Sequence, residues 1–311
     1  MFASRVENCK YGRDNYNGAV MSVKTAQYQN KVYGSGSTPK VTLFLAFYNN
    51  VEFFKKVFAS IEVQSFRDFE LVICDDGSHD AAVNDLRDLY ENSDVRVLHL
   101  WHEDRGFYKN EMLNRGVLKS RGEYLVFVDA DCVLHPDFLQ DHWNNRQEGH
   151  TLAGRRVDLT PKVAAGLTVE RIKSHYLQRN WWWIAPTMVW MKDNNAIKGF
   201  RITSQWLYKK LNRKSRGLVG CNFSVAKSDL IKVNGFDMTY YKPGIGEDSD
   251  IDFRLSGIGV TPIPMIHQAI QYHLYHKLQA RSQVNEAKFV ALKESKKYIT
   301  DCGLEQLKSQ S

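Results

Sequence analysis

Continuous apolar runs alternate with segments of helical spacing along the first half of the chain. Runs of this kind predict strands buried on both faces, and the spacing between them predicts helices. The expected strands are 41–47, 69–74, 95–100 and 124–128, and the expected helices start near Asn50 and cover about 80–90 and 108–119. Because strand and helix alternate with short connections, the pattern predicts an α/β fold with a mostly parallel central sheet flanked by helices.

The fourth expected strand ends in two carboxylates, since Tyr124–Val128 is followed by Asp129, Ala130 and Asp131. Ligands of open α/β sheets bind beyond the carboxyl ends of the strands. Neighbouring carboxylates repel each other unless a cation lies between them, and hard divalent cations prefer oxygen ligands. The motif therefore fits a divalent-cation site, while a solvated acidic turn explains it equally well.

The second half of the chain has weaker patterns. Residues 217–225 predict a strand that leads into a helix at 228–233, and Ile266–Tyr275 alternates like a strand with His273 and Tyr272 on opposite faces. Glycines flank an acidic helix that starts near Asp248, where the helix dipole favours an ionised carboxylate. Asp248 is thus suited to act as a general base, although the same acids would also serve as helix caps.

The composition is that of a globular chain, with 311 residues of which 43% are hydrophobic and 25% charged. This length suffices for one large domain with an appendage. The five cysteines are scattered without a Cys-x-x-Cys pair, which indicates free thiols in a reducing, cytoplasmic compartment. The first residues lack the apolar core of a secretory signal, and the apolar stretch Trp181–Met191, interrupted by Pro186, is too short to span a bilayer.

The net charge of +7 is concentrated in one segment. Residues 155–216 contain fourteen Lys and Arg against three acids, a net charge of +11 that leaves −4 for the rest of the chain, and they hold five of the seven tryptophans. Such a segment suits an anionic membrane surface, a charged polymeric acceptor or single-stranded nucleic acid. Tryptophans that pack a subdomain core beneath a solvated basic face are an equally good explanation.

Two phosphate-binding motifs are missing from the sequence. No Gly-x-Gly-x-x-Gly follows the first expected strand, and no Gly-x-x-x-x-Gly-Lys-Ser/Thr occurs. These absences exclude a dinucleotide-binding turn and a P-loop. A metal ion held by Asp129 and Asp131 would instead bind phosphate oxygens as a Lewis acid.

Several motifs, taken in order, resemble glycosyltransferase family 2 with the GT-A fold. They are 41–49, Cys-Asp-Asp-Gly-Ser at 74–78, Asp-Ala-Asp at 129–131, Asn-Gly-Phe-Asp at 234–237, Glu-Asp at 247–248 and Tyr-His-Leu-Tyr-His at 272–276. Residues 103–107 and 246–250 are most similar to the chondroitin-polymerase and galactosyltransferase-like branch of that family.

The resemblance covers about residues 40–276 and implies a GT-A domain with two halves. These would be a Rossmann-like nucleotide-binding half at 40–150, a basic, Trp-rich acceptor or membrane segment at 155–216 and a catalytic and acceptor half at 217–276. Residues 1–39 are expected to be an extension and linker, and residues 277–311 a helical tail.

On the nucleotide side, the resemblance implies that Asp76, with Asp75, accepts a hydrogen bond from the uracil N3–H. Ala46 and Tyr48 would line the base and ribose, with Ala130 beside them. Relatives often carry an arginine near the diphosphate. The candidates for that role in this chain are Lys109, Arg115 and Arg105.

On the metal side, the resemblance implies that Asp131 binds Mn²⁺ or Mg²⁺, that Asp129 holds the metal or the ribose, and that His273 is the third ligand. His276 is the alternative to His273. In a continuing strand these two histidines point to opposite faces, whereas a turn would let both reach the metal.

On the acceptor side, the resemblance implies that Asp248 is the catalytic base and that Glu247 and Asn222 contact the acceptor. The expected function is an inverting, metal-dependent transfer of a hexose-type sugar from a UDP-sugar to a hydroxyl of a glycan or glycolipid. The basic segment adds an expected peripheral contact with an anionic membrane.

Two other functions compete with this one. A sugar-phosphate nucleotidyltransferase uses a related sheet, but it needs a Gly-rich basic loop that Tyr48-Asn49-Asn50 does not supply. A non-enzymatic module that binds an anionic polymer through the basic segment would have salt-sensitive affinity that does not depend on Asp131 or Asp248. Nucleic acid is the less favoured partner.

Overall fold

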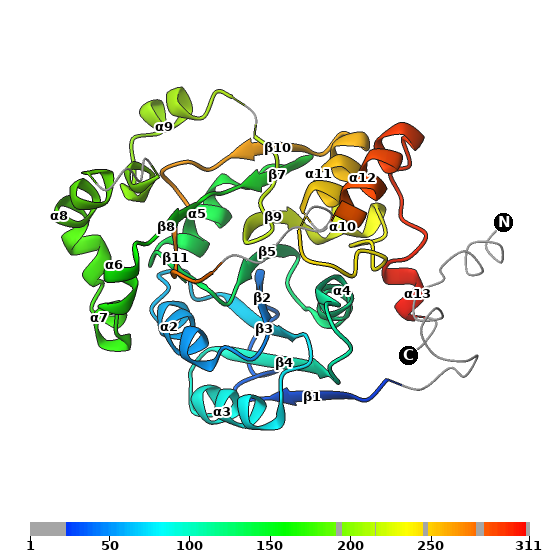
Figure 1. Ribbon diagram of the computed structural model, residues 1–311, viewed down its shortest axis with the longest axis horizontal. Helices are drawn as coiled ribbons and strands as arrows, with labels where there is room; N and C mark the ends of the chain where they lie inside the picture. Colours follow the sequence, from blue (N-terminus) through cyan, green and yellow to red (C-terminus); the bar gives the residue numbers. More distant parts are fainter. Residues whose placement is uncertain (1–22, 191–194, 215, 245–247, 278–282, 309–311) are drawn as a thin grey trace.

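The structure is a computed structural model that describes residues 23–190, 195–214, 216–244, 248–277 and 283–308. Within these residues, the centre is an eight-stranded sheet of order β1-β4-β3-β2-β5-β9-β7-β10 (Figure 1). Its strands are β1 (Thr25–Gln29), β2 (Val41–Phe47), β3 (Phe69–Asp75), β4 (Arg96–His102), β5 (Tyr124–Asp129), β7 (His150–Ala153), β9 (Asn222–Ala226) and β10 (Thr261–Pro264).

The first half of the chain forms the parallel part of this sheet. Strands β4, β3, β2 and β5 are parallel neighbours, and α2 (Val51–Glu62), α3 (Asp80–Tyr90) and α4 (Lys109–Lys119) connect them. One apolar core packs α2 and α3 on one face, and a second core packs α4 on the other. The predicted α/β architecture is therefore confirmed, with antiparallel pairs where β1 joins β4 and where β9 lies between β5 and β7.

Residues 1–39 were expected to be an extension and linker, yet Thr25–Gln29 forms the edge strand β1, which is antiparallel to β4. Its side chains alternate between exposed and half-buried positions. A strand at the edge of a sheet buries little surface and gives no continuous apolar run, so the sequence pattern did not reveal it.

A second, three-stranded sheet carries part of the candidate site. It consists of β6 (Cys132–Leu134), β11 (Gln271–His273) and β8 (Arg156–Asp158). The strand expected at Ile266–Tyr275 is therefore much shorter, because His267 and Ala269 have left-handed backbone conformations that interrupt it. Both faces of the strand are covered, because residues 269–274 are all buried.

The basic segment is mostly helical. Its elements are α6 (Pro161–Ala165), α7 (Val169–Lys173), α8 (Tyr176–Trp190), the short 3₁₀ helix η1 (Ala196–Gly199) and α9 (Gln205–Leu211). Trp181 of α8 is buried, and its ring centroid lies 4.9 Å from that of Tyr272 in β11. Trp182, Trp183 and Trp206 are exposed. One tryptophan thus packs the core, as the second explanation predicted, while the others face solvent.

The remaining helices complete the two faces of the large sheet. They are α5 (Phe138–Asn145), α10 (Lys227–Lys232), α11 (Asp248–Gly257), α12 (Gln283–Ser295) and α13 (Leu304–Lys308). α12 packs on α11, and α13 packs on α4 through the buried Leu304. The C-terminal residues that the structure describes are thereby joined to the large sheet.

Cys9 lies outside the described residues, and of the four cysteines that are described, one differs from expectation. Cys74, Cys132 and Cys221 are free and buried, as predicted, but Cys302 is disulfide-bonded. Burial raises the pKa of the Cys132 thiol well above its usual value, so this thiol is a poor nucleophile.

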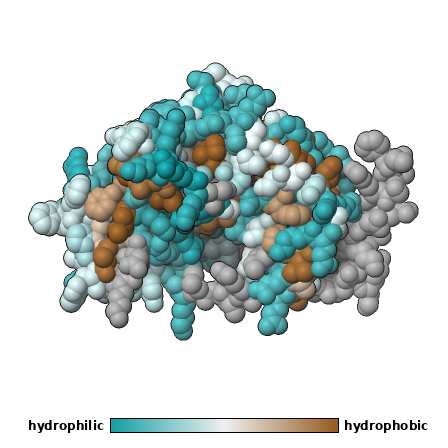
Figure 2. All heavy atoms as spheres, turned by 90° about the horizontal axis from the view of Figure 1, so that it is seen from above, coloured by the Kyte–Doolittle hydropathy of each residue, from teal (hydrophilic) through white to brown (hydrophobic). Residues whose placement is uncertain are grey.

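The surface mixes polar and apolar groups. Figure 2 shows separate hydrophobic patches among hydrophilic side chains on the face seen from above. Among the helices that the structure describes, none has the length and apolarity needed to cross a bilayer.

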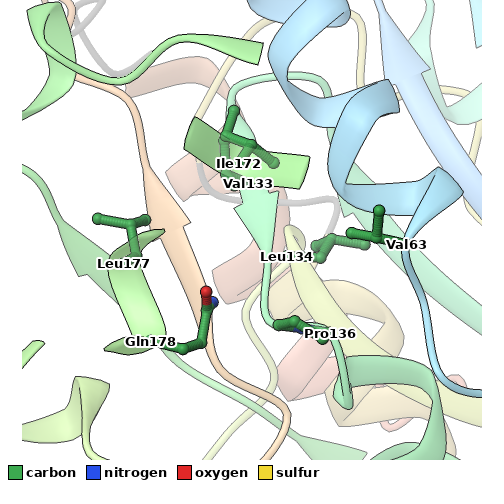
Figure 3. Close-up of a pocket in the computed structure, with 7 residues that line it drawn as sticks. All are labelled: Val63, Val133, Leu134, Pro136, Ile172, Leu177 and Gln178. Carbon is green, nitrogen blue, oxygen red and sulfur yellow. The ribbon is translucent and has the colours of Figure 1, made fainter. Parts of the chain in front are cut away.

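A small cavity lies where α7 and α8 pack against α2 and β6 (Figure 3). Its volume is about 10 Å³, which is close to the space that one water molecule requires. The lining is Val63, Val133, Leu134, Pro136, Ile172, Leu177 and Gln178. The cavity is therefore a packing seam between helices and is too small for a sugar or a nucleotide.

The stability of the sheet depends on a row of aromatic rings. Phe127 of β5 stacks between Phe44 and Phe223, at centroid distances of 4.7 and 4.6 Å. We expect Phe127→Ala to lower the free energy of unfolding by about 3–5 kcal/mol, because it leaves a cavity at the centre of the sheet. Urea denaturation measures this change, with Phe127→Leu as the milder control. A loss below about 1 kcal/mol would contradict the assigned packing.

Candidate active site

A pocket of about 380 Å³ opens at the carboxyl ends of β2, β3 and β5. Its size is within the range of small-molecule sites, and its place at the strand ends is where α/β sheets bind ligands. The lining residues are Ala46, Phe47, Tyr48, Cys74, Asp76, Asp104, Gly106, Phe107, Lys109, Asp129 and Pro243.

Asp76 is held in this pocket by its backbone and side-chain partners. Its carboxylate accepts hydrogen bonds from the backbone N–H of Tyr108, at 2.9 and 3.1 Å, and lies 2.9 Å from Nε2 of His102. Burial raises the pKa of Asp76, while these hydrogen bonds oppose the increase. The next residue, Gly77, has a φ of +93°, and a Cβ there would lie 2.6 Å from the Asp104 backbone. Only glycine fits this turn, which fixes the position of Asp76.

Asp75, expected to assist Asp76, does not line the pocket. Its side chain is fully buried, where one oxygen accepts from the Ser78 N–H and the other lies 3.0 Å from Nε2 of His99. Successive residues near the end of a strand point to opposite sides, so only one of two neighbouring acids can face the ligand. Asp75 therefore stabilises the turn that presents Asp76.

Tyr48 and Ala46 line the pocket as expected, and Ala130 donates its N–H to the carbonyl of Ala46. Tyr48 is 52% exposed, and its hydroxyl donates to Asp104. Ala130 thus joins the ends of β2 and β5, whereas the flat, accessible ring of Tyr48 forms part of the pocket wall.

The cation in the pocket is Lys109 rather than an arginine. Its Nζ lies 2.7 Å from Oδ1 of Asp129, and both residues line the pocket. The other two candidates, Arg105 and Arg115, both bind Glu111. The structure therefore favours Lys109 among the three basic residues that the sequence put forward.

Asp131 and two histidines form a compact cluster just beyond the pocket. Oδ2 of Asp131 lies 3.2 Å from Nε2 of His273 and 3.0 Å from Nε2 of His276, and the two ring nitrogens are 3.0 Å apart. These three atoms converge within 4.8 Å of one another. Because β11 ends at His273, the chain turns and both histidines reach the same point.

This donor set fits a divalent metal ion. One carboxylate oxygen and two imidazole nitrogens converge from one side, which is the arrangement of a metal site with open positions. Imidazole ligands suit transition metals, whereas Mg²⁺ prefers oxygen ligands and bound water. Of the two expected ions, Mn²⁺ is therefore the better match. Asp129, also an expected ligand, lies outside the cluster and binds Lys109 instead.

Asp158 is the neighbour that orients His273, and no sequence motif pointed to it. The two residues are paired in the parallel register of β8 and β11, and Oδ1 of Asp158 lies 2.9 Å from Nδ1 of His273. A proton on Nδ1 leaves Nε2 free to bind a metal, so Asp158 selects the useful tautomer. The nearby Arg156 in turn contacts Asp158 at 3.1 Å.

Electrostatic interactions within this cluster are strong. Burial alone would lower the pKa of His273, but its hydrogen bonds with Asp131 and Asp158 raise that pKa to about 9. A hydrogen bond with Asp131 also raises the pKa of His276. Burial alone would raise the pKa of Asp131, whereas the two histidines hold it well below its usual value. The Asp131 carboxylate is thus the negatively charged group with which both rings interact.

Asp248 begins α11, as the sequence pattern predicted. Its Oδ2 accepts from the Gly220 N–H at 3.3 Å, and its Oδ1 accepts from the Ser249 N–H at 2.7 Å. The side chain is half-buried, and Pro243, five residues earlier, lines the pocket. The expected acceptor contact Glu247 lies outside the described residues.

The environment of Asn222 does not fit its expected role in binding an acceptor. It is fully buried, and its amide NH₂ donates to the carbonyls of Arg155 and Ala269. Its side-chain oxygen lies 3.2 Å from Nε2 of His142. Because all its polar atoms are engaged, Asn222 joins the two sheets and has no group left for a ligand.

Comparisons with known proteins agree with this geometry. The family model described as glycosyl transferase family 2 matches residues 42–221, and the model described as N-terminal domain of galactosyltransferase matches residues 200–277. The putative glycosyltransferase EpsH of Bacillus subtilis is 31% identical over 103 residues, which are 33% of this chain and 29% of that protein. The GalNAc(5)-diNAcBac-PP-undecaprenol beta-1,3-glucosyltransferase of Campylobacter jejuni is 26% identical over 112 residues, 36% of each protein.

Solved structures share the fold at low identity. Residues 1–349 of TarS from S. aureus, solved in complex with UDP-GlcNAc, give a TM-score of 0.53 at 14% identity, covering 83% of this chain and 66% of that one. The mannosyltransferase PcManGT from Pyrobaculum calidifontis, in complex with GDP-Man and Mn²⁺, gives 0.50 at 17% identity, covering 78% and 58%.

The sheet and its strand-end pocket therefore define a GT-A fold of the glycosyltransferase class. More specifically, the chain belongs to glycosyl transferase family 2, whose model covers more than half of its 311 residues. The chain spans about a third of the length of the two curated relatives it matches here.

The cluster predicts a loss of metal affinity on substitution of its ligands. We expect His276→Ala to weaken Mn²⁺ binding by at least about tenfold, because it removes one of three converging donors. Titration followed by electron paramagnetic resonance measures free Mn²⁺ directly. His150→Ala, which removes an imidazole from β7, should bind like the wild type. Equal affinity in the His276 variant would exclude His276 as a ligand.

Substitution of Asp158 tests the same equilibrium through the residue that orients His273. We expect Asp158→Asn to weaken Mn²⁺ binding by about 10-fold to 100-fold, because the amide no longer fixes the His273 ring in the productive tautomer. The same titration applies, and nitrogen-15 chemical shifts of the His273 ring would report the tautomer. Unchanged shifts together with unchanged affinity would show that Asp158 is only structural.

Proposed function

We propose that this chain is an inverting, metal-dependent glycosyltransferase that moves a hexose-type sugar from a UDP-sugar to a hydroxyl of a glycan or lipid-linked acceptor. The observation that carries the proposal is the Asp131–His273–His276 cluster beside the Asp76 pocket, at the ends of parallel strands. Family membership supports glycosyl transfer, and the TarS complex with UDP-GlcNAc supports a UDP-sugar donor.

Asp76 is the proposed contact for the nucleobase. A carboxylate offers about four lone pairs, and its bonds with the Tyr108 N–H and His102 occupy three of these directions. One acceptor position therefore remains for the N3–H of uracil. Guanine presents a different pattern of donors in this position, so a single fixed acceptor favours uridine nucleotides.

Lys109 and the metal cluster are the proposed contacts for the diphosphate. The Lys109–Asp129 pair lies in the pocket, which places a cation beside the expected path from base to phosphate. A bound metal supplies Lewis-acid stabilisation of the leaving nucleoside diphosphate. Asp131, His273 and His276 hold that ion, and Asp158 orients the ring of His273.

Asp248 is the proposed general base. At the start of α11, its carboxylate is held by the backbone N–H groups of Gly220 and Ser249, which suits it to take a proton from the acceptor hydroxyl. That hydroxyl oxygen then forms the new bond to the anomeric carbon as the bond to the diphosphate breaks. One such displacement inverts the configuration of the anomeric carbon.

Separate observations bear on the acceptor and on the two alternative functions, a nucleotidyltransferase and an anion-binding module. The printed name of the Campylobacter jejuni relative describes an undecaprenol-linked acceptor, which supports a lipid-linked acceptor here. For a nucleotidyltransferase, the segment after β2 lacks the needed loop, since Asn50 caps α2 directly. A purely anion-binding module would leave the converging cluster without a role.

The base assignment predicts a selective loss of turnover. We expect Asp248→Asn to lower kcat by about 10²–10⁴-fold while the affinities for Mn²⁺ and UDP stay unchanged, because the amide keeps the size of the side chain and one accepting oxygen but cannot take a proton. Sugar transfer is measured with a panel of UDP-sugars and acceptors. Asp252→Asn, one turn further along α11, is the matched control. Full turnover in the Asp248 variant would overturn the assignment.

A further inference from the structure

Helix α8 has two apolar faces, and only one of them is covered. Its inner face is buried through Leu177, Trp181, Ala185 and Met188. On the outer face, Trp182, Trp183 and Trp190 are 73%, 78% and 87% exposed. A surface helix normally places polar residues on its outer side, so three exposed tryptophans on one helix indicate a contact surface.

Helix α9 extends this surface. Trp206 is 71% exposed, Leu211 is 45% exposed, and Lys210 lies over the Trp206 ring at 5.1 Å. Figure 1 shows α8 and α9 on the same flank of the molecule. Phe200, in the connection between them, packs against Trp182 with ring centroids 4.8 Å apart. We call the exposed side chains of both helices the α8–α9 surface.

The charges on the α8–α9 surface have one sign. Residues 176–190 and 195–214, as far as the structure describes them, contain no Asp or Glu. The exposed cations are Arg179, Lys209, Lys210, Arg213 and Lys214. Tryptophan combined with lysine and arginine is typical of protein surfaces that lie in the headgroup region of a bilayer.

We propose that the α8–α9 surface docks this chain on an anionic lipid bilayer. Sugar hydroxyls are usually bound by carboxylates and amides, and the described residues of this surface include no carboxylate. Single-stranded nucleic acid is usually bound in a basic groove. The exposed tryptophans instead line neither of the two cavities described above. An apolar surface edged by cations alone therefore matches lipid headgroups best.

The position of the surface connects it to the candidate active site. Trp181, on the inner face of α8, packs against Tyr272, the residue before His273. One helix diameter, about 10 Å, therefore separates the bilayer side of α8 from the strand that carries a metal ligand. Resting on the proposed function, this geometry would present a lipid-linked acceptor to the site from the membrane.

Vesicle co-sedimentation tests the proposal. We expect the wild-type chain to sediment with vesicles of phosphatidylcholine and phosphatidylglycerol at 7:3, to bind pure phosphatidylcholine vesicles at least about tenfold more weakly, and to lose affinity as salt increases. Trp182→Ser/Trp183→Ser should lower binding to the anionic vesicles by at least about tenfold. Ile231→Ser/Val290→Ser, which removes exposed apolar groups elsewhere, should bind like the wild type.

Controls separate this proposal from the proposed function. Thermal melting verifies that each variant is folded, and Mn²⁺ and UDP affinities in vesicle-free buffer report the donor site independently. Absence of binding to anionic vesicles, or equal binding by the Trp182/Trp183 variant, would overturn the proposal. Tighter binding to a dT oligonucleotide or to heparin than to the vesicles would also overturn it, in favour of a polymer.

Discussion

The contact between the Asp131 carboxylate and the rings of His273 and His276 is the constraint on which the rest of the site depends. Asp131 is 142 positions from His273 and 145 from His276 in the sequence, and three short strands bring the acid and the histidines together. The backbone N–H of Leu274 donates to the carbonyl of Asp131, which fixes the end of β11 against the end of β5. The two ring nitrogens lie 3.0 Å apart beside one carboxylate oxygen. A cation bound between these three atoms would stabilise the arrangement.

The two parts of the candidate site rest on different kinds of structure. The strand-end pocket lies on the parallel half of the sheet, where buried strands and a glycine turn hold Asp76. The Asp131–His273–His276 cluster lies on the small sheet, where strand pairing places Asp158 beside His273. Asp129 and Asp131 connect them, because the first faces Lys109 in the pocket and the second faces the histidines.

Much of this could be predicted from the sequence, because buried strands leave continuous apolar runs and the acids that follow them lie at one edge of the sheet. The polar edge strand β1 leaves no such run, so it was missed. A linear pattern also cannot show which of two adjacent acids faces a ligand, as with Asp75 and Asp76. Asn222 and Asp158 depend on contacts between distant segments, so their surroundings emerge only in three dimensions.

The central claim is that the cluster and the pocket bind one ligand together, and the affinity for UDP with and without Mn²⁺ tests it most directly. Calorimetric titration of the wild type should show UDP binding at least about tenfold more tightly with Mn²⁺ than with a chelator. In Asp131→Asn the two affinities should become equal, near the wild-type value in chelator. The account would be contradicted if the UDP affinity of the wild type did not change with Mn²⁺. It would also be contradicted if Mn²⁺ raised the UDP affinity of Asp131→Asn as much as that of the wild type.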